Sequence, residues 1–60
     1  MSAVGYEPDT GVLEIEFRSG AVYRYFLVPS SVVEELVTSP SKGTFFVERI
    51  KGAFASERVA

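Results

Sequence analysis

Hydrophobic and polar residues alternate along two stretches near the start of the chain, on either side of the turn sequence Pro8–Gly11. Proline suits the first corner of a turn, aspartate bonds its own backbone, and glycine accepts a left-handed conformation. A loop of this length pairs Tyr6 with Leu13. The same register pairs Val4 with Ile15, on the same face of the strands. The pattern therefore predicts a β-hairpin with one apolar face.

A second turn is predicted at Arg18–Gly20, where the glycine suits a left-handed position in a three-residue loop. The strand that follows places Tyr23 and Tyr25 on the apolar face. Glu14 then lies opposite Arg24 on the reverse face, as a cross-strand pair of opposite charge. Because two independently derived turns give one consistent register, we predict a three-stranded antiparallel meander.

Helical patterns follow the meander. Ser31 and Glu34 have the spacing of a capping box just after Pro29, which predicts the start of one helix. A second helix is predicted to begin after Ser41 and to end at Gly52. These helices carry the remaining long apolar stripes and are needed to cover the sheet. We therefore expect an α+β fold, a three-stranded antiparallel meander followed by two short helices packed on one face.

The end of the chain alternates loosely from Phe54 to Arg58, and for it we favour a fourth strand over an extended tail. With 60 residues the chain has room for one domain, spanning residues 1–60, with a small core. The predicted core combines the apolar face of the meander with the helix stripes: Val4, Tyr6, Leu13, Ile15, Phe17, Tyr23, Tyr25, Leu27, Val33, Leu36, Phe46 and Ile50.

Composition excludes several classes of chemistry. The chain contains neither cysteine nor histidine, so disulfides, thiolate nucleophiles, zinc sites of the Cys/His type and imidazole acid–base catalysis are ruled out. No apolar run approaches the roughly 20 residues of a membrane span, and no signal-like segment is evident. We expect a cytoplasmic protein that is not an enzyme, with no metal, no cofactor and no membrane partner.

Charge is distributed unevenly about a net value of −2. Residues 1–41 carry six acidic and two basic side chains, whereas residues 42–60 carry four basic and two acidic ones. An acidic protein is a poor general ligand for phosphate backbones. The basic C-terminal third is nevertheless the best candidate for contact with an anion.

An ordered series of short motifs resembles the KTSC domain family. The series runs from Tyr23-Arg24-Tyr25 through Val28-Pro29 to Ser41-Lys42-Gly43, and the resemblance extends from about Ala3 to Arg58. The family consists of small domains at the C-terminus of some lysyl-tRNA synthetases and of free-standing small proteins. The resemblance implies a binding module associated with RNA and assigns no catalytic residues.

Two interpretations compete for the tyrosines of the central motif. Exposed rings on a sheet stack on bases, whereas rings in a core pack with their hydroxyls at its edge. The derived register favours the core interpretation. A second candidate lies at the start of the second predicted helix, where free backbone amides and nearby cations could bind an anion. The candidate nucleic-acid-binding residues are Lys42, Gly43, Arg49, Lys51, Tyr23 and Tyr25.

The reverse face of the sheet supports a second hypothesis from a different class. Apolar residues stand there where a solvated strand would carry polar ones, which is typical of a surface for a protein partner or for self-association. The alternative is that Phe54 and Val59 fold back over this face, and the sequence leaves both open. The candidate interface residues are Val12, Val22, Arg24, Phe26 and Val28.

Overall fold

The first hairpin has the predicted register. The computed structural model describes all 60 residues, and in it strands β1 (Ala3–Glu7) and β2 (Val12–Glu16) pair antiparallel, with Tyr6 opposite Leu13. Gly11 closes the turn with φ +72°. This left-handed conformation is available to glycine at little cost, as the turn prediction required.

The second hairpin is also confirmed. Strand β3 (Val22–Tyr25) pairs antiparallel with β2, with Tyr23 opposite Ile15, and Gly20 has φ +92° in the turn between them. On the reverse face, Arg24 Nε lies 2.9 Å from Glu14 Oε1. Both side chains are about half exposed, so we assign this ion pair a stabilisation of under about 1 kcal/mol.

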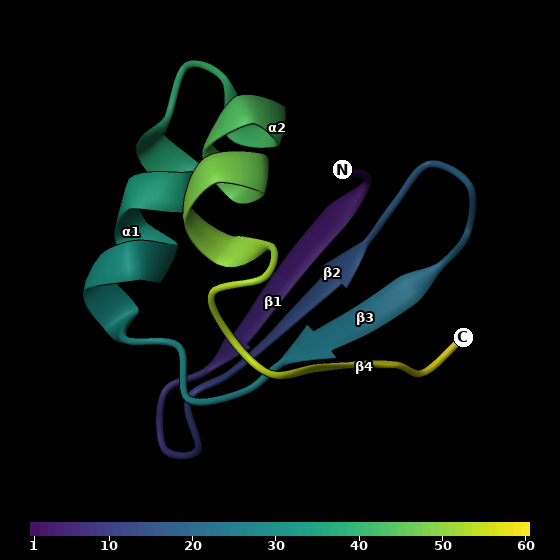
Figure 1. Cartoon of the computed structure of the whole chain (residues 1–60), viewed down its shortest axis with the longest axis horizontal. Helices are drawn as coiled ribbons and strands as arrows, with labels where there is room; N and C mark the ends of the chain where they lie inside the picture. The colour runs from purple at the N-terminus through teal and green to yellow at the C-terminus, as the bar shows by residue number, and fades with distance from the viewer.

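The predicted fourth strand at the end of the chain is confirmed. Strand β4 (Ser56–Arg58) pairs antiparallel with β3 and gives a sheet with the strand order β1-β2-β3-β4. The tail thus extends the sheet at its edge instead of folding over the reverse face, and Phe54 packs against the core. The C-terminus lies beside the turn between β2 and β3 (Figure 1), where the Val22 N–H donates to the Ala60 carbonyl.

Helix α1 (Ser30–Thr38) begins two residues earlier than the capping-box spacing predicts, since that spacing makes Ser31 the N-cap. Pro29 is the N-cap, and its carbonyl accepts hydrogen bonds from the amides of Val32 and Val33. Ser31 already lies inside the helix, so its side chain cannot cap the first turn, and that prediction was wrong. The backbone of Pro29, with its restricted φ, sets the start of the helix instead.

The second predicted helix consists of two joined segments. Helix α2 (Lys42–Phe45) continues directly into η1 (Phe46–Ile50), a π-helical turn in which the Lys51 amide donates to the Phe46 carbonyl over 2.8 Å. Gly52, with φ +79°, follows the last turn as predicted. No helix of the protein combines the length and apolar character needed to span a membrane.

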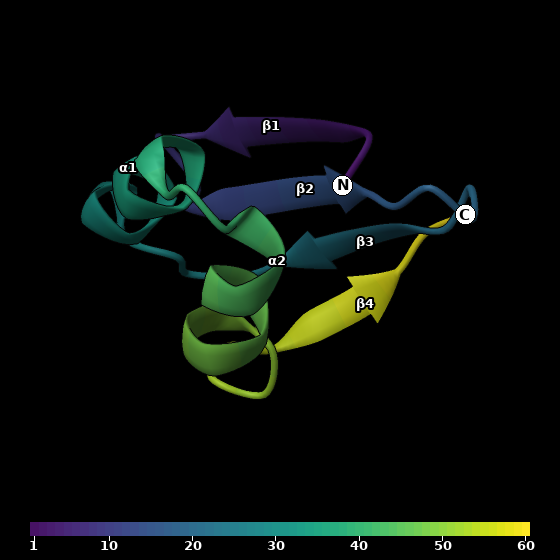
Figure 2. The same ribbon diagram turned by 90° about the horizontal axis from the view of Figure 1, so that it is seen from above.

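All helical segments lie on one face of the sheet. Figure 2 shows α1 nearer to β1, α2 and η1 nearer to β3 and β4, and no helix over the part of the sheet next to the turn between β2 and β3. The core lies between the layers and consists of Leu13, Ile15, Tyr25, Val28, Val33, Leu36, Phe46 and Ile50. Tyr6, Phe17 and Tyr23 are half-buried against it, as partial members of the predicted core.

The main correction concerns the residues that follow β3. Leu27, predicted for the core, has φ +56° and is 81% exposed, whereas Val28, predicted for the reverse face, is 1% exposed. The left-handed residue interrupts strand alternation and turns the next side chain inward. Val28 is held there by its own N–H, which donates to the Gly11 carbonyl, and by its carbonyl, which accepts from the Tyr6 hydroxyl.

Two smaller corrections lie at the borders of the core. Val4 is 36% exposed because it lies on β1, the edge strand farthest from β4. Val37 is also exposed, although its apolar side chain and its place beside Leu36 in the first helix suit an apolar stripe, whereas Val33 and Leu36 on the same helix are buried. The helix therefore buries a narrower face than its sequence predicts.

Replacement of Gly11 tests the contact that holds this backbone. A Cβ at Gly11 would lie 3.2 Å from the Leu27 Cα, in addition to the strain of a positive φ. Gly11→Ala is therefore expected to lower the free energy of unfolding by about 2 kcal/mol or more. Gly20→Ala is the control, because its φ is also positive but its Cβ would meet nothing within 4 Å. If urea unfolding shows the same loss of unfolding free energy in both variants, the close approach of position 11 to the Leu27 backbone is contradicted.

Candidate functional site

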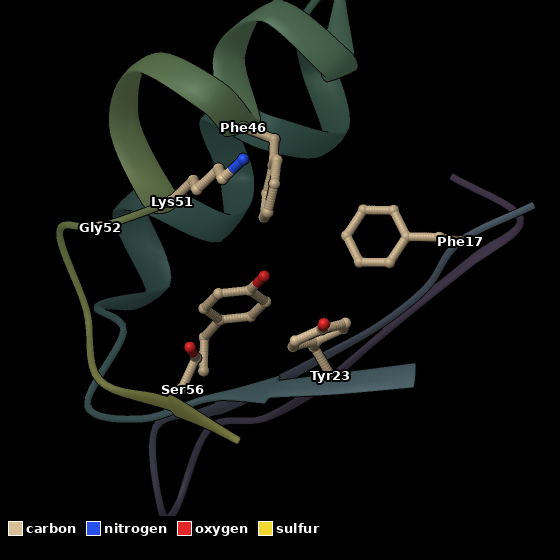
Figure 3. A pocket seen from close by; sticks show the side chains of 7 residues that line it. Phe17, Tyr23, Phe46, Lys51, Gly52 and Ser56 are labelled. Atoms are coloured by element: carbon tan, nitrogen blue, oxygen red, sulfur yellow. The ribbon is translucent and has the colours of Figure 1, made fainter. Parts of the chain in front are cut away.

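A pocket of about 300 Å³ opens between the end of the helical layer and the sheet. Figure 3 shows it from close by, with Lys51 above the cavity, Ser56 below it and Phe17 at one side. None of its lining residues is acidic, and four of them are aromatic. The lining residues are Phe17, Tyr23, Tyr25, Phe46, Lys51, Gly52 and Ser56.

Strand alternation brings the two tyrosines to the pocket. Tyr23 and Tyr25 project from the same side of β3 because they are two residues apart. Tyr25 is 5% exposed and belongs to the core, while Tyr23 is half-buried nearer the uncovered end of the sheet. Ser56 is the cross-strand partner of Tyr25 on β4 and lines the same pocket.

The four aromatic rings pack in two orientations. Tyr23 and Tyr25 are nearly parallel, with ring centroids 6.4 Å apart and an angle of 24°. Phe17 stands edge-on to Tyr23 at 80°, and Phe46 stands edge-on to Tyr25 at 77°. Such edge-to-face pairs are each worth about 0.5–1.5 kcal/mol beyond area burial, so the rings hold one another in place.

The π-helical turn brings Lys51 to the same cavity as Phe46. The two residues are five apart and are joined by the hydrogen bond from the Lys51 amide to the Phe46 carbonyl. In a regular α-helix, residues four apart are bonded and residues five apart point in different directions. The wider turn lets both side chains line the pocket from the helical layer (Figure 3).

The phenol of Tyr25 is perturbed by this environment. Burial raises its pKa above the ordinary value, and the neighbouring Tyr23 raises it further. The phenol therefore stays neutral at physiological pH and presents an uncharged ring and hydroxyl to the site.

Comparison with known proteins assigns the fold to a family. Residues 1–54 match the KTSC domain. The chain belongs to the KTSC domain family. A KTSC domain protein from Yersinia pestis, known from its crystal structure, is similar over 95% of this chain and 80% of its own, with a TM-score of 0.91 and 38% sequence identity.

Relatives of this KTSC domain include both long and short proteins. A lysine–tRNA ligase from a Nostoc species is 48% identical over all 60 residues, and one from Nostoc punctiforme is 53% identical over 55 residues. The chain spans only 11% and 10% of the length of these ligases. An uncharacterized protein from Stutzerimonas stutzeri is 43% identical over 85% of this chain and 72% of its own length.

The structure places the predicted nucleic-acid-binding residues of the KTSC domain in three locations, of which Arg49 occupies one by itself. Tyr23, Tyr25 and Lys51 line the pocket together. Lys42 and Gly43 lie in the first turn of α2, where the Lys42 ammonium donates to the Ser39 carbonyl. The predicted set is therefore not one site.

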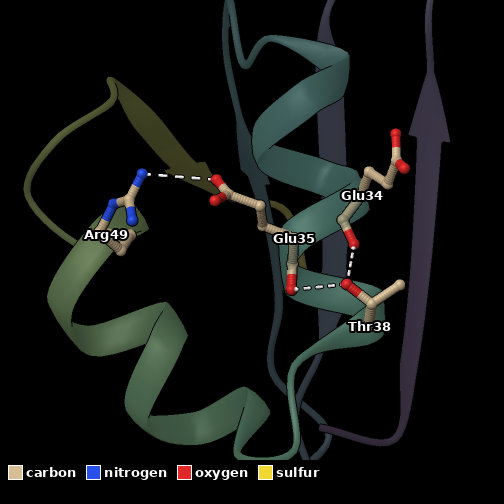
Figure 4. A network of polar contacts seen from close by, with 4 residues as sticks. All are labelled: Glu34, Glu35, Thr38 and Arg49. Carbon is tan, nitrogen blue, oxygen red and sulfur yellow. Dashed lines mark hydrogen bonds and ion pairs between the residues drawn. The ribbon is translucent and has the colours of Figure 1, made fainter.

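Arg49 is engaged elsewhere. Its guanidinium lies 3.4 Å from the Glu35 carboxylate and 5.3 Å from the centre of the Phe45 ring. Figure 4 shows this ion pair linking η1 to α1, near the hydrogen bonds from the Thr38 hydroxyl to the Glu34 and Glu35 carbonyls. Arg49 thus joins the two helical segments and does not line the pocket.

Sequence reasoning missed four lining residues as site residues. Phe17 and Phe46 were assigned to the core, and Gly52 to the end of a helix. Ser56 had no role, although its place in an alternating C-terminal strand was a signal that it shares a face with a residue of β3. Only the pairing of β4 with β3 and the π-helical turn show that these residues meet the tyrosines.

The candidate protein interface on the reverse face is smaller than predicted. Val28 lies in the core, so it is removed from this surface. Val12, Val22 and Phe26 are half-buried, and Arg24 is paired with Glu14.

The structure contains no group of three or more histidine, cysteine, aspartate or glutamate side chains close enough together to hold a metal ion.

The raised pKa of Tyr25 predicts a loss of stability at alkaline pH. The unfolded phenol ionises near its ordinary pKa of about 10, and the folded one only at higher pH. The stabilisation that the folded state gains from the protonated phenol is therefore complete below about pH 10, and it is lost as the pH rises through the higher pKa of the folded protein. Denaturant unfolding should show a smaller alkaline loss in Tyr25→Phe than in the wild type, and parallel pH profiles of the two proteins would refute the assignment.

Proposed function

We propose that this KTSC domain is a non-catalytic module that binds RNA through the aromatic pocket and Lys51. The observation that carries the proposal is the joining of four aromatic rings and a lysine in one cavity without an acidic residue. Aromatic side chains stack on bases, and lysine contacts phosphates. The lining therefore has the two kinds of group that RNA recognition uses.

The distribution of charge supports this surface over the rest of the molecule. Strand alternation directs four glutamates to the reverse face of the sheet, where Arg24 is the basic residue among them. A polyanion approaching the protein would be repelled there and not at the pocket. The acidic net charge is thus compatible with a local anion site. The glutamates of the reverse face are Glu7, Glu14, Glu16 and Glu57.

Relatives provide a second line of support. The two relatives from Nostoc described above are lysine–tRNA ligases by name, and they contain a segment similar to the whole or nearly the whole of this chain. A module within an enzyme that acts on tRNA is well placed to contact RNA. In the proposal, the same surface performs this role in the present chain, in the cytoplasm.

The chemistry of the pocket favours binding over catalysis. Its polar side chains are two tyrosines, a serine and a lysine, and the phenol of Tyr25 has a raised pKa. The Ser56 hydroxyl has no hydrogen bond to a general base that could activate it as a nucleophile. We therefore propose no enzymatic activity and no cofactor for the site.

The reverse face is the weaker candidate for function. Its apolar residues Val12, Val22 and Phe26 are only half-buried, but the charged residues between them interrupt any continuous apolar patch. Protein interfaces have cores depleted in charge. A protein partner or self-association through this face remains the alternative proposal if the pocket binds no RNA.

Salt dependence tests the role of Lys51. Each phosphate contact to a single strand contributes about 0.7 to the slope of log K against log salt concentration. Amide NMR titrations of labelled wild-type protein with a mixed-sequence single-stranded RNA should move signals of the pocket residues. In Lys51→Gln the binding should weaken and the salt slope should fall by about that amount.

Lys42→Gln is the matched control, because Lys42 is exposed on α2 and outside the pocket. It should leave the slope and the shifted residues unchanged. Equal effects of the two substitutions would disprove a specific site at the pocket. The absence of any shift in the wild type at low salt would disprove RNA binding altogether.

A further inference from the structure

We infer that the pocket receives one unstacked base of a single-stranded RNA, and that Arg58 binds phosphate in addition to Lys51. The inference rests on the proposed function and specifies its ligand. It derives from the size of the pocket, the orientation of its rings and the register of β4.

The dimensions of the pocket fit a single flat group. Its volume of about 300 Å³ is at the lower end of the range of sites that bury small ligands. Tyr23 is half-buried and lies at the uncovered end of the sheet, so part of its ring remains accessible. A base stacked parallel to Tyr23 would stand nearly perpendicular to Phe17, whose ring is at 80° to the tyrosine. The base would then have one stacked and one edge-to-face contact.

Arg58 projects beside the pocket from the sheet edge. The register of β3 and β4 pairs Arg58 with Tyr23 and Ser56 with Tyr25. Side chains of directly paired residues project from the same face of a sheet, and Ser56 already lines the pocket. Arg58 therefore stands next to the accessible ring of Tyr23. Glu57, which lies between Ser56 and Arg58 in the sequence, projects from the reverse face.

The guanidinium of Arg58 has donors to spare. Its Nε donates to the Ala60 carbonyl over 3.0 Å, and its two terminal nitrogens make no hydrogen bond or ion pair within the protein. By contrast, Arg24 and Arg49 are each paired with a glutamate. Lys51 approaches the pocket from the helical layer and Arg58 from β4, so a backbone running past the pocket would meet a cation from each layer.

This geometry selects single strands. A base must leave its stack to enter the pocket, and in a duplex that step also breaks a base pair, at a cost of a few kcal/mol. A single strand has no pairing to lose. Fluorescence anisotropy can measure the binding of three labelled ligands: a short oligouridine, the same strand annealed to its complement, and a strand of equal length with abasic residues. The abasic strand keeps the phosphates and lacks the bases, so the comparison separates stacking from phosphate contact.

Wild-type protein should bind the single strand about tenfold or more tightly than either the duplex or the abasic strand, in line with the loss of one stacked base. Arg58→Gln should weaken binding to the single strand severalfold and lower its salt slope, as is also expected of Lys51→Gln. Arg24→Gln is the control, because Arg24 is the neighbour of Tyr23 on β3 but projects from the reverse face.

The outcomes separate the two proposals. If the wild type binds all three nucleic acids equally, RNA binding stands and the single-base site is overturned. If Arg58→Gln binds like the wild type while Lys51→Gln is weakened, the assignment of Arg58 is overturned. If the wild type binds none of them, the RNA-binding function itself fails.

Discussion

The left-handed backbone at Leu27 is the constraint on which the arrangement of the two layers depends. The chain leaves β3, reverses its alternation, and buries Val28 where strand geometry would have placed Leu27. Gly11 permits this because it lacks a Cβ that would meet the Leu27 backbone. The conformation costs about 1–2 kcal/mol, and burial of a valine side chain contributes about 1.5–3 kcal/mol. Pro29 then follows in position to start α1, so a turn between two strands helps to determine where the helical layer begins.

The sheet separates two surfaces with different chemistry. On one face the helices and the aromatic rings exclude water, and the uncovered end of that face holds the pocket. On the other face, glutamates are exposed around the pair of Glu14 and Arg24. Since strand alternation assigns side chains to the faces, the separation of acidic residues from the pocket follows from the register of the strands. The lining of the pocket thus contains no acidic residue, although the net charge of the chain is −2.

The pocket and the core share residues, so the proposed binding of RNA and the stability of this KTSC domain would depend on the same aromatic rings. Tyr25 and Phe46 are buried members of the core and also line the pocket. In a chain of 60 residues the core is small, and each aromatic ring accounts for a large part of it. Of the four aromatic rings of the pocket, those of Phe17 and Tyr23 have surface available to a ligand. The π-helical turn adds Lys51 to this surface, and a regular helix of the same sequence would direct it elsewhere.

The sequence by itself determined the α+β class, both hairpin registers, the Glu14–Arg24 pair and most of the core, because turn chemistry and alternation act between neighbouring residues. It also placed Tyr23 and Tyr25 on the apolar face. The tertiary structure alone decided the exchange of Leu27 for Val28, since that depends on the approach of the backbone to Gly11. It likewise decided which cation reaches the tyrosines. Lys42, Arg49 and Lys51 are close in sequence, but helix rotation, the π-helical turn and the pairing with Glu35 direct only Lys51 to the pocket.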